Sequence, residues 1–131
     1  MGNFFNRHHR ALFYGAWLLI NIIQAANTEL FDDEAYYWIY SRFPGWGYFD
    51  HPPMIALLIK AGYSIFDNEL GVRLFIVLLN TATIFIIEQL TDKKNPLLFY
   101  AIASSVGIAH LGGMIAVPDI PLLFFSAAFF W

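Results

Sequence analysis

Long apolar stretches with few or no charges are the feature that most limits what this chain can fold into. They cover residues 11–27, 71–90 and 96–117, and a fourth runs from residue 120 to the end. The first three have about the 20 residues that a transmembrane helix needs, and the fourth stops short of that length. Apolar residues make up 59 % of the chain and charged residues 13 %, against about 45–50 % and about 25 % in ordinary globular domains. We therefore expect an all-α, polytopic transmembrane helical bundle.

The bulk composition also excludes other classes of protein. A soluble domain of 131 residues needs more polar surface than this chain can supply, and a disordered chain would be polar and rich in charge. The net charge of −3 offers no basic surface for nucleic acid. Because the sequence has no cysteine, disulfides, thiolate catalysis and zinc–thiolate sites are ruled out in this segment.

The segment 28–70 differs from the apolar stretches on either side of it. It holds seven of the ten acidic residues and three of the six prolines. Residues 33–43 predict a short amphipathic helix, which Asp32 or Asp33 can cap and whose aromatic residues suit a membrane surface. Residues 53–66 predict a second helix, which begins at a proline and is too short to span a bilayer. We expect one long external loop that contains two surface helices.

Four basic residues set the expected orientation of the chain: Arg7, Arg10, Lys93 and Lys94. If the helix at 53–66 does not span, all four lie on one side, and the positive-inside rule makes that side the cytoplasm. The N-terminus is then cytoplasmic, and the loop 28–70 and Asp119 face outward. The alternative for the first apolar stretch is a signal peptide, but the residues that follow it form a poor cleavage site.

Three acidic clusters on the expected external face are candidates for chemistry. Residues 32–34 can serve as helix caps, or supply a general base for an acceptor hydroxyl. Asp50 and His51, followed by two prolines, can form a turn into a helix, a metal or phosphate site, or an acid–base pair. Asp119 is either an N-cap or a further member of the same site. A helix–turn–helix would bring Asp33 and Asp50 together.

Three isolated residues each have two interpretations. Arg73, at the external end of the second span, can pair with an acid or hold an anionic lipid phosphate. Lys60 has the same two interpretations. His110, within the third span, is more often a hydrogen-bonded interior histidine than a ligand.

Four motifs follow one another along the chain. They are FDDEAYYW at 31–38, GYFDHPPM at 47–54, GVRL at 71–74 and VPDIPL at 117–122. In this order they resemble the N-terminal part of a GT-C glycosyltransferase. The nearest group is the bacterial branch similar to protein O-mannosyltransferases, lipopolysaccharide glycosyltransferases and aminoarabinose transferases. The resemblance covers nearly the whole chain, and the first two motifs at this spacing are its most specific part.

The resemblance implies a multi-pass enzyme of the bacterial inner membrane. It would transfer a sugar, with inversion, from a polyprenyl-phosphate donor to a hydroxyl or phosphate of a lipid, glycan or protein acceptor on the external face. Asp33 corresponds to the presumed catalytic base, and Glu34 is its neighbour. Asp50 corresponds to a residue that shapes the acceptor or metal region, so a divalent metal at Asp50 is one option. The expected substrate-binding residues are Asp50, His51, Arg73, Asp119 and Tyr37.

His51 departs from the family pattern, because some relatives carry there a lysine that contacts the donor phosphate. A neutral imidazole is a weaker partner for an anion than an ammonium group.

Two other classes of protein fit parts of the pattern. A transporter or channel fragment would line an ion path with charged residues inside the spans, whereas these acids lie outside them or at a rim. A non-catalytic membrane anchor would tolerate neutralisation of all three acidic clusters. Because the family that the motifs resemble has longer chains with more spans, we expect an N-terminal fragment that is inactive when isolated.

Overall fold

The computed structural model describes residues 2–91, 95–106 and 113–131, with side chains from residue 8 onward. Within these ranges the chain forms helices joined by turns and loops, without a strand. The helices are α1 (Gly2–Asn27), α2 (Asp32–Arg42), α3 (Met54–Tyr63), α4 (Glu69–Leu90), α5 (Pro96–Ser105) and α7 (Asp119–Phe130). The all-α expectation is therefore confirmed for the described part of the chain.

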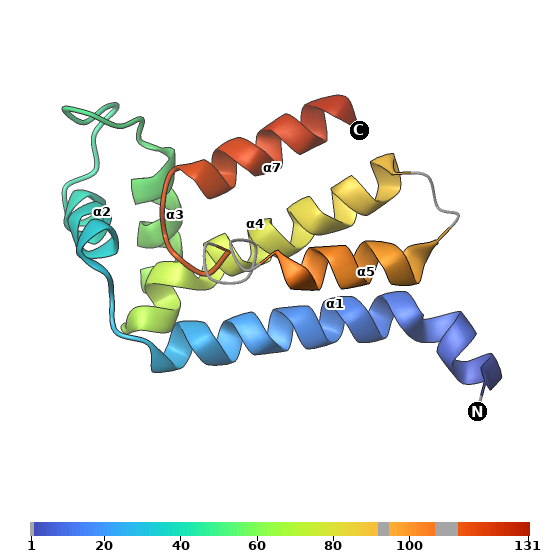
Figure 1. Ribbon diagram of the computed structural model, residues 1–131. Helices are drawn as coiled ribbons and strands as arrows, with labels where there is room; N and C mark the ends of the chain where they lie inside the picture. The colour runs from blue at the N-terminus through green and yellow to red at the C-terminus, as the bar shows by residue number, and fades with distance from the viewer. Residues whose placement is uncertain (1, 92–94, 107–112) are drawn as a thin grey trace.

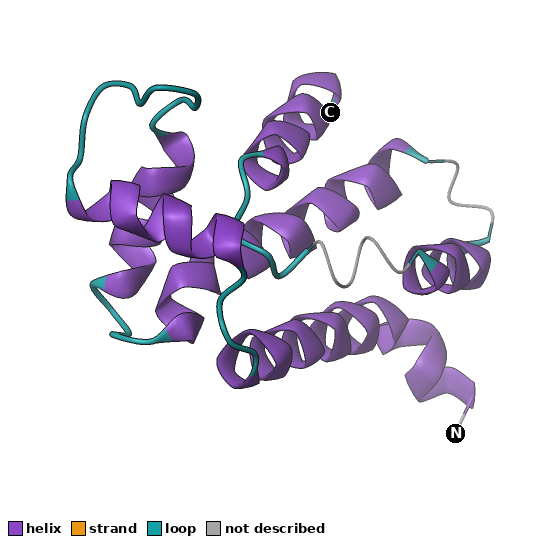
Figure 2. Ribbon diagram, turned by 60° about the vertical axis from the view of Figure 1, so that its left-hand side comes forward, coloured by secondary structure: helices purple, strands orange, loops and turns teal. Residues whose placement is uncertain are grey.

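Helix α4 lies at the centre of the fold and packs against α1, α3 and α7 (Figure 1). Helices α2 and α3 pack against each other at the end where α1 finishes and where α4 and α7 begin. We call this the loop end. The loop 43–53 projects beyond the helices there, as Figure 2 shows from a second direction.

A buried apolar cluster lies beneath α2 and α3 and joins them to α4 and α7. Its members are Tyr37, Ile55, Ile59, Val72, Ile76, Ala116 and Ile120. Burying side chains of this size stabilises a fold by roughly 1.5–3 kcal/mol each. The loop end is therefore a packed platform, on which polar side chains can be held in fixed positions.

Both segments expected to form short helices do so, as α2 and α3, but the expected caps are wrong. The N-cap of α2 is Phe31, whose backbone N–H donates to Glu34 Oε2 at 3.0 Å, while Asp32 is already the first helical residue. The N-cap of α7 is likewise Pro118 and not Asp119. These aspartates instead place negative charge in the first turn, where it complements the helix dipole.

Helix α4 is the helix in the described ranges that is long and apolar enough, by length and composition, to cross a membrane. Helix α1 is longer, but Asn21, Gln24 and Asn27 make it more polar. Helices α5 and α7 have 10 and 12 residues, fewer than the roughly 20 that a span requires. The expected span 96–117 is corrected to a helix that ends at Ser105, and His110 lies outside the described residues.

Two glycines allow α3 and α4 to approach closely. A Cβ atom on Gly62 would overlap the carbonyl oxygen of Gly71, and a Cβ on Gly71 would overlap the carbonyl oxygen of Phe66. Gly15, in α1, has open space around the same position.

We expect Gly62→Ala to lower the free energy of unfolding by about 1–3 kcal/mol, because the backbones of α3 and α4 must move apart. Gly15→Ala is the matched control, and it should be neutral or stabilise by up to about 1 kcal/mol, since alanine is the better helix former. Denaturant unfolding in detergent measures both. Equal effects of the two variants would contradict the close approach.

Candidate functional site

The loop end is held together by a buried ion pair between Glu34 of α2 and Arg73 of α4. Both side chains are 0 % exposed. Arg73 Nε lies 2.7 Å from Glu34 Oε1, and Arg73 Nη2 lies 2.5 Å from Glu34 Oε2. This two-point geometry is the strong form of an arginine–carboxylate pair.

The other N–H groups of Arg73 donate to backbone carbonyls at the end of α1 and just after it. Nη1 donates to Ala25 O at 3.1 Å and to Thr28 O at 2.6 Å, and Nη2 donates to Glu29 O at 2.9 Å. A guanidinium has five N–H donors, and all five have an acceptor here. Arg73 thus satisfies carbonyls that would otherwise be left unpaired where the chain leaves α1.

Glu34 accepts two further hydrogen bonds, both from backbone N–H groups. Its Oε2 accepts from Phe31 N, and its Oε1 accepts from Ala116 N at 2.8 Å. The ion pair therefore connects α1, α2, α4 and the segment before α7. This corrects two expected site roles, because Glu34 and Arg73 are closed to a substrate and support the loop end from inside.

Asp33 lies directly before Glu34 in α2 but differs from it in both burial and hydrogen bonding. Its side chain is exposed and makes no hydrogen bond or ion pair with the residues that the structure describes. Successive residues of a helix point about 100° apart, so the burial of Glu34 turns Asp33 toward the outside of α2. Asp33 is therefore open to an acceptor, as is the exposed Asp32, and of these two it is the charge of Asp33 that acts on Tyr37.

Asp50, in the loop 43–53, is held by two tyrosines of α2. The Tyr36 hydroxyl lies 3.1 Å from Asp50 Oδ2, and the Tyr40 hydroxyl lies 3.0 Å from Asp50 Oδ1. The two hydroxyls also contact each other. Tyr48 fixes the loop further, since its hydroxyl donates to Tyr40 O at 2.9 Å and its ring stacks on the Tyr40 ring at 4.1 Å.

His51 lies between Asp50 and Tyr37. Its Nε2 is 3.0 Å from the Tyr37 hydroxyl and 3.5 Å from Asp50 Oδ2. The His51 side chain is 33 % exposed, so one part of the ring faces the protein and another part faces outward. The structure thus brings three of the expected site residues into direct contact.

Tyr37 lies within range of negative charge from all three acidic clusters. Its pKa is raised, first by burial and then by the negative charges of Asp33, Asp50 and Asp119. These acids belong to α2, to the loop 43–53 and to α7. The expectation that Asp33, Asp50 and Asp119 lie on one face of the molecule agrees with this arrangement.

The pKa of Tyr40 is raised, first by the hydrogen bond with Tyr36, then by burial and by the hydrogen bond to Asp50. A tyrosine whose pKa is raised on folding stabilises the fold below its unfolded pKa of about 10, and this stabilisation is lost as the pH rises above that value. Asp50→Asn should therefore lower the Tyr40 pKa and make the loss of stability above pH 10 less steep.

NMR titration of ring-labelled tyrosine measures this effect. Asp67→Asn is the matched control, because Asp67 raises the pKa of Tyr63 through a hydrogen bond and should leave Tyr40 unchanged. A Tyr40 that titrates like a free tyrosine in the unaltered chain would contradict the arrangement.

A metal site at Asp50 finds no support in the donor set. Within the ranges that the structure describes, no group of three or more histidine and acidic side chains could hold a metal ion. Asp50 is instead occupied by tyrosine hydroxyls. The expected divalent metal at Asp50 therefore lacks partner ligands in this part of the chain.

A second polar cluster, which no sequence motif indicated, lies at the opposite end of α4. Glu88 accepts hydrogen bonds from Arg10 Nε at 3.1 Å and from the hydroxyls of Tyr14 and Tyr100 at 3.0 Å. This cluster ties α1, α4 and α5 together. Arg10, expected only to set the orientation of the chain, thus also has a structural role.

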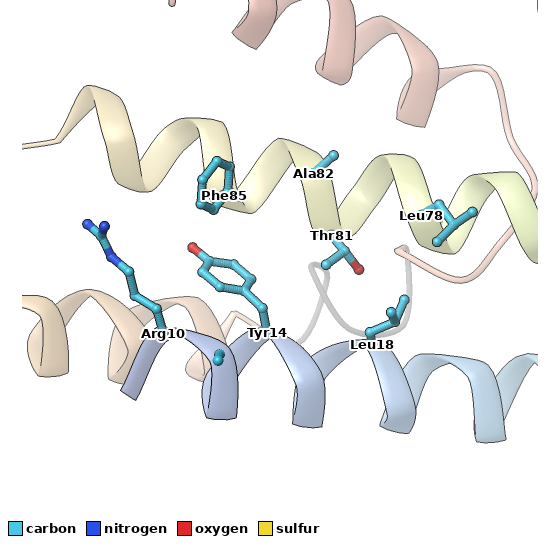
Figure 3. A pocket seen from close by; sticks show the side chains of 8 residues that line it. Arg10, Tyr14, Leu18, Leu78, Thr81, Ala82 and Phe85 are labelled. Carbon is cyan, nitrogen blue, oxygen red and sulfur yellow. The ribbon is translucent and has the colours of Figure 1, made fainter. Parts of the chain in front are cut away.

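An apolar groove runs beside this second cluster, between α1 and α4. Its volume is about 410 Å³, and Figure 3 shows Tyr14 and Leu18 of α1 facing Leu78 and Phe85 of α4 across it. The groove is lined almost wholly by carbon, and no acidic side chain lines it. It therefore offers no carboxylate as a general base, and the candidate site remains the acidic cluster at the loop end.

Comparison of the chain with protein-family models, with curated proteins and with solved structures finds no match.

Proposed function

We propose that the chain contributes the acceptor-activating face of a membrane glycosyltransferase of the GT-C type. The observation that carries this proposal is the contrast between two adjacent acids. Glu34 is buried and fully hydrogen-bonded, whereas Asp33 is exposed, uncommitted and close enough to Tyr37 for its charge to act there together with Asp50 and Asp119. A carboxylate left free on a rigid platform is what a general base requires.

In the proposed reaction Asp33 takes the proton from an acceptor hydroxyl. The acceptor oxygen then forms a bond to the anomeric carbon of the donor sugar from the face opposite the leaving group. The bond between that carbon and the phosphate oxygen breaks, and polyprenyl phosphate leaves with the bonding electrons. The logic is that of an inverting glycosidase, with an acceptor in place of water.

The surroundings of Asp33 fit this chemistry. Helix α4 begins at the loop end and is apolar enough to cross a membrane, so a site there would lie at the bilayer surface, where a lipid-linked donor presents its sugar. Exposed aromatic residues at this end, including Phe43 and Trp46, suit the membrane interface. His51 is the basic side chain that the cluster itself contains, because Arg73 is committed to Glu34.

Sugar transfer is tested in vesicles that contain the protein. The assay supplies a labelled polyprenyl-phosphate sugar and follows the label into acceptor. Transfer of the label supports the proposal. Uptake of solute into the vesicles without transfer would favour a transporter instead, and neither activity would favour an anchor.

A further inference from the structure

The basic side chains that the structure describes outside the histidines fall into two groups. Arg10 and Arg73 are each paired with a buried glutamate. Arg42 and Lys60 make no ion pair within the described ranges, and both line the same pocket. The chain has a net negative charge, so it needs to be explained why two cations without an acidic partner lie in one pocket.

The pocket lies between the C-terminal ends of α2 and α3. Its volume is about 290 Å³, and its lining consists of Ser41, Arg42, Lys60, Tyr63 and Ser64. No carboxylate lines it. The Ser41 and Ser64 hydroxyls donate to the carbonyls of Trp38 and Ala61, so the two cations are the groups that suit an anion, and a phosphate group fits them best.

Arg42 is held in place by aromatic rings and not by acids. Its guanidinium carbon lies 5.7 Å from the Trp38 ring centre and 5.8 Å from the Tyr63 ring centre. Such contacts fix the side chain while leaving its N–H groups open. Lys60 is exposed, so its ammonium group is free to turn toward a ligand.

A simpler explanation is that each cation complements the dipole at the end of its own helix. Arg42 and Lys60 are indeed in the last turns of α2 and α3, where positive charge is favourable. That explanation accounts for each residue separately. It does not account for an open pocket between them, nor for Arg42 being held without an acidic partner.

The position of the pocket suggests where the anion comes from. Ser64 is followed directly by Ile65 and Phe66, which are exposed, and then by α4. If α4 crosses the membrane, the pocket lies where that helix enters the bilayer, at the level of lipid head groups. Exposed apolar residues beside unpaired cations suit a ligand that carries both a phosphate and an acyl chain.

We propose that Arg42 and Lys60 form a binding site for a phosphate group, supplied by the head group of an anionic lipid or by free phosphate. The site uses none of the residues assigned to sugar transfer, so the test of the phosphate site does not depend on that function. Asp67 acts against it, since Asp67 and Tyr63 line a neighbouring pocket together and this brings a negative charge to the edge of the site.

The test measures binding to the full chain in a non-ionic detergent by isothermal calorimetry. The probes are inorganic phosphate and dihexanoyl phosphatidylglycerol, which carries phosphate on short acyl chains. We expect the lipid to bind more tightly than inorganic phosphate. Binding of the two probes with equal affinity would support the phosphate site and identify free phosphate as the source.

Arg42→Gln and Lys60→Gln should each weaken binding about tenfold or more, because each removes a charge-assisted contact. Lys60→Arg keeps the charge and should retain binding. Asp67→Asn should tighten binding, an outcome that damage to the fold cannot produce. If neither probe binds, or if the two glutamine variants bind as tightly as the unaltered chain, the proposal is overturned.

Discussion

Replacing Asp33 by asparagine is expected to abolish sugar transfer and to leave the fold intact. An amide cannot accept the proton of the acceptor hydroxyl, and loss of a positioned general base typically slows a reaction by about 10²–10⁴-fold. Asp33 is exposed and has no hydrogen-bond partner in the described ranges. Its contribution to stability is then limited to the favourable charge in the first turn of α2, worth about 0.3–1 kcal/mol.

Asp32→Asn is the matched control for this experiment. Asp32 is also exposed, lies in the same turn of α2 and loses the same charge. The measurement is transfer from a labelled polyprenyl-phosphate sugar by the protein in vesicles, with expression and the unfolding temperature followed in parallel. Retained transfer in Asp33→Asn would reject the assignment of the base, and so would equal losses in both variants.

The helices of the loop end could be predicted from the sequence because charge and proline mark them. The acidic residues and prolines of the segment 28–70 separate two short helices from the apolar stretch that becomes α4. The capping residues could not be predicted in the same way. Phe31 holds the N-cap of α2 because Glu34 reaches back to its N–H, and that geometry depends on Glu34 being drawn inward by Arg73.

The candidate site was only partly predictable for the same reason. Helical geometry requires Asp33 and Glu34 to face different sides, but the sequence does not say which of them faces inward. That choice depends on Arg73, 39 positions along the chain from Glu34. By contrast, the i, i+4 spacing of Tyr36 and Tyr40 indicates a shared helix face, so this spacing is a signal that could have located the partners of Asp50.

Replacing Arg73 by glutamine is expected to destabilise the fold far more than the loss of an exposed charge would. Glu34 would then be a buried charge without a cation, and removing one partner of a buried pair typically costs about 3–5 kcal/mol. Arg73→Lys should rescue little of this loss, because an ammonium group cannot reproduce five donors in a planar fork. Glu34→Gln should be destabilising for the reciprocal reason.

The double variant Glu34→Leu/Arg73→Met distinguishes this pair from an isolated ion pair. A buried pair without further partners can often be replaced by apolar residues at little cost. Here the backbone carbonyls of Ala25, Thr28 and Glu29 would also lose their donors, and an unsatisfied carbonyl that is buried, as at Ala25, costs about 1–3 kcal/mol. The double variant should therefore remain well below the unaltered chain in stability.

Denaturant unfolding in detergent measures these variants, and Arg42→Gln is the control, since that cation is exposed and makes no ion pair in the described ranges. Any activity lost in the Arg73 variants should follow the loss of folded protein, whereas Asp33→Asn should lose activity while remaining folded. A double variant as stable as the unaltered chain would show that the backbone contacts of Arg73 do not stabilise the loop end. The buried pair would then do no more than neutralise the charges of Glu34 and Arg73.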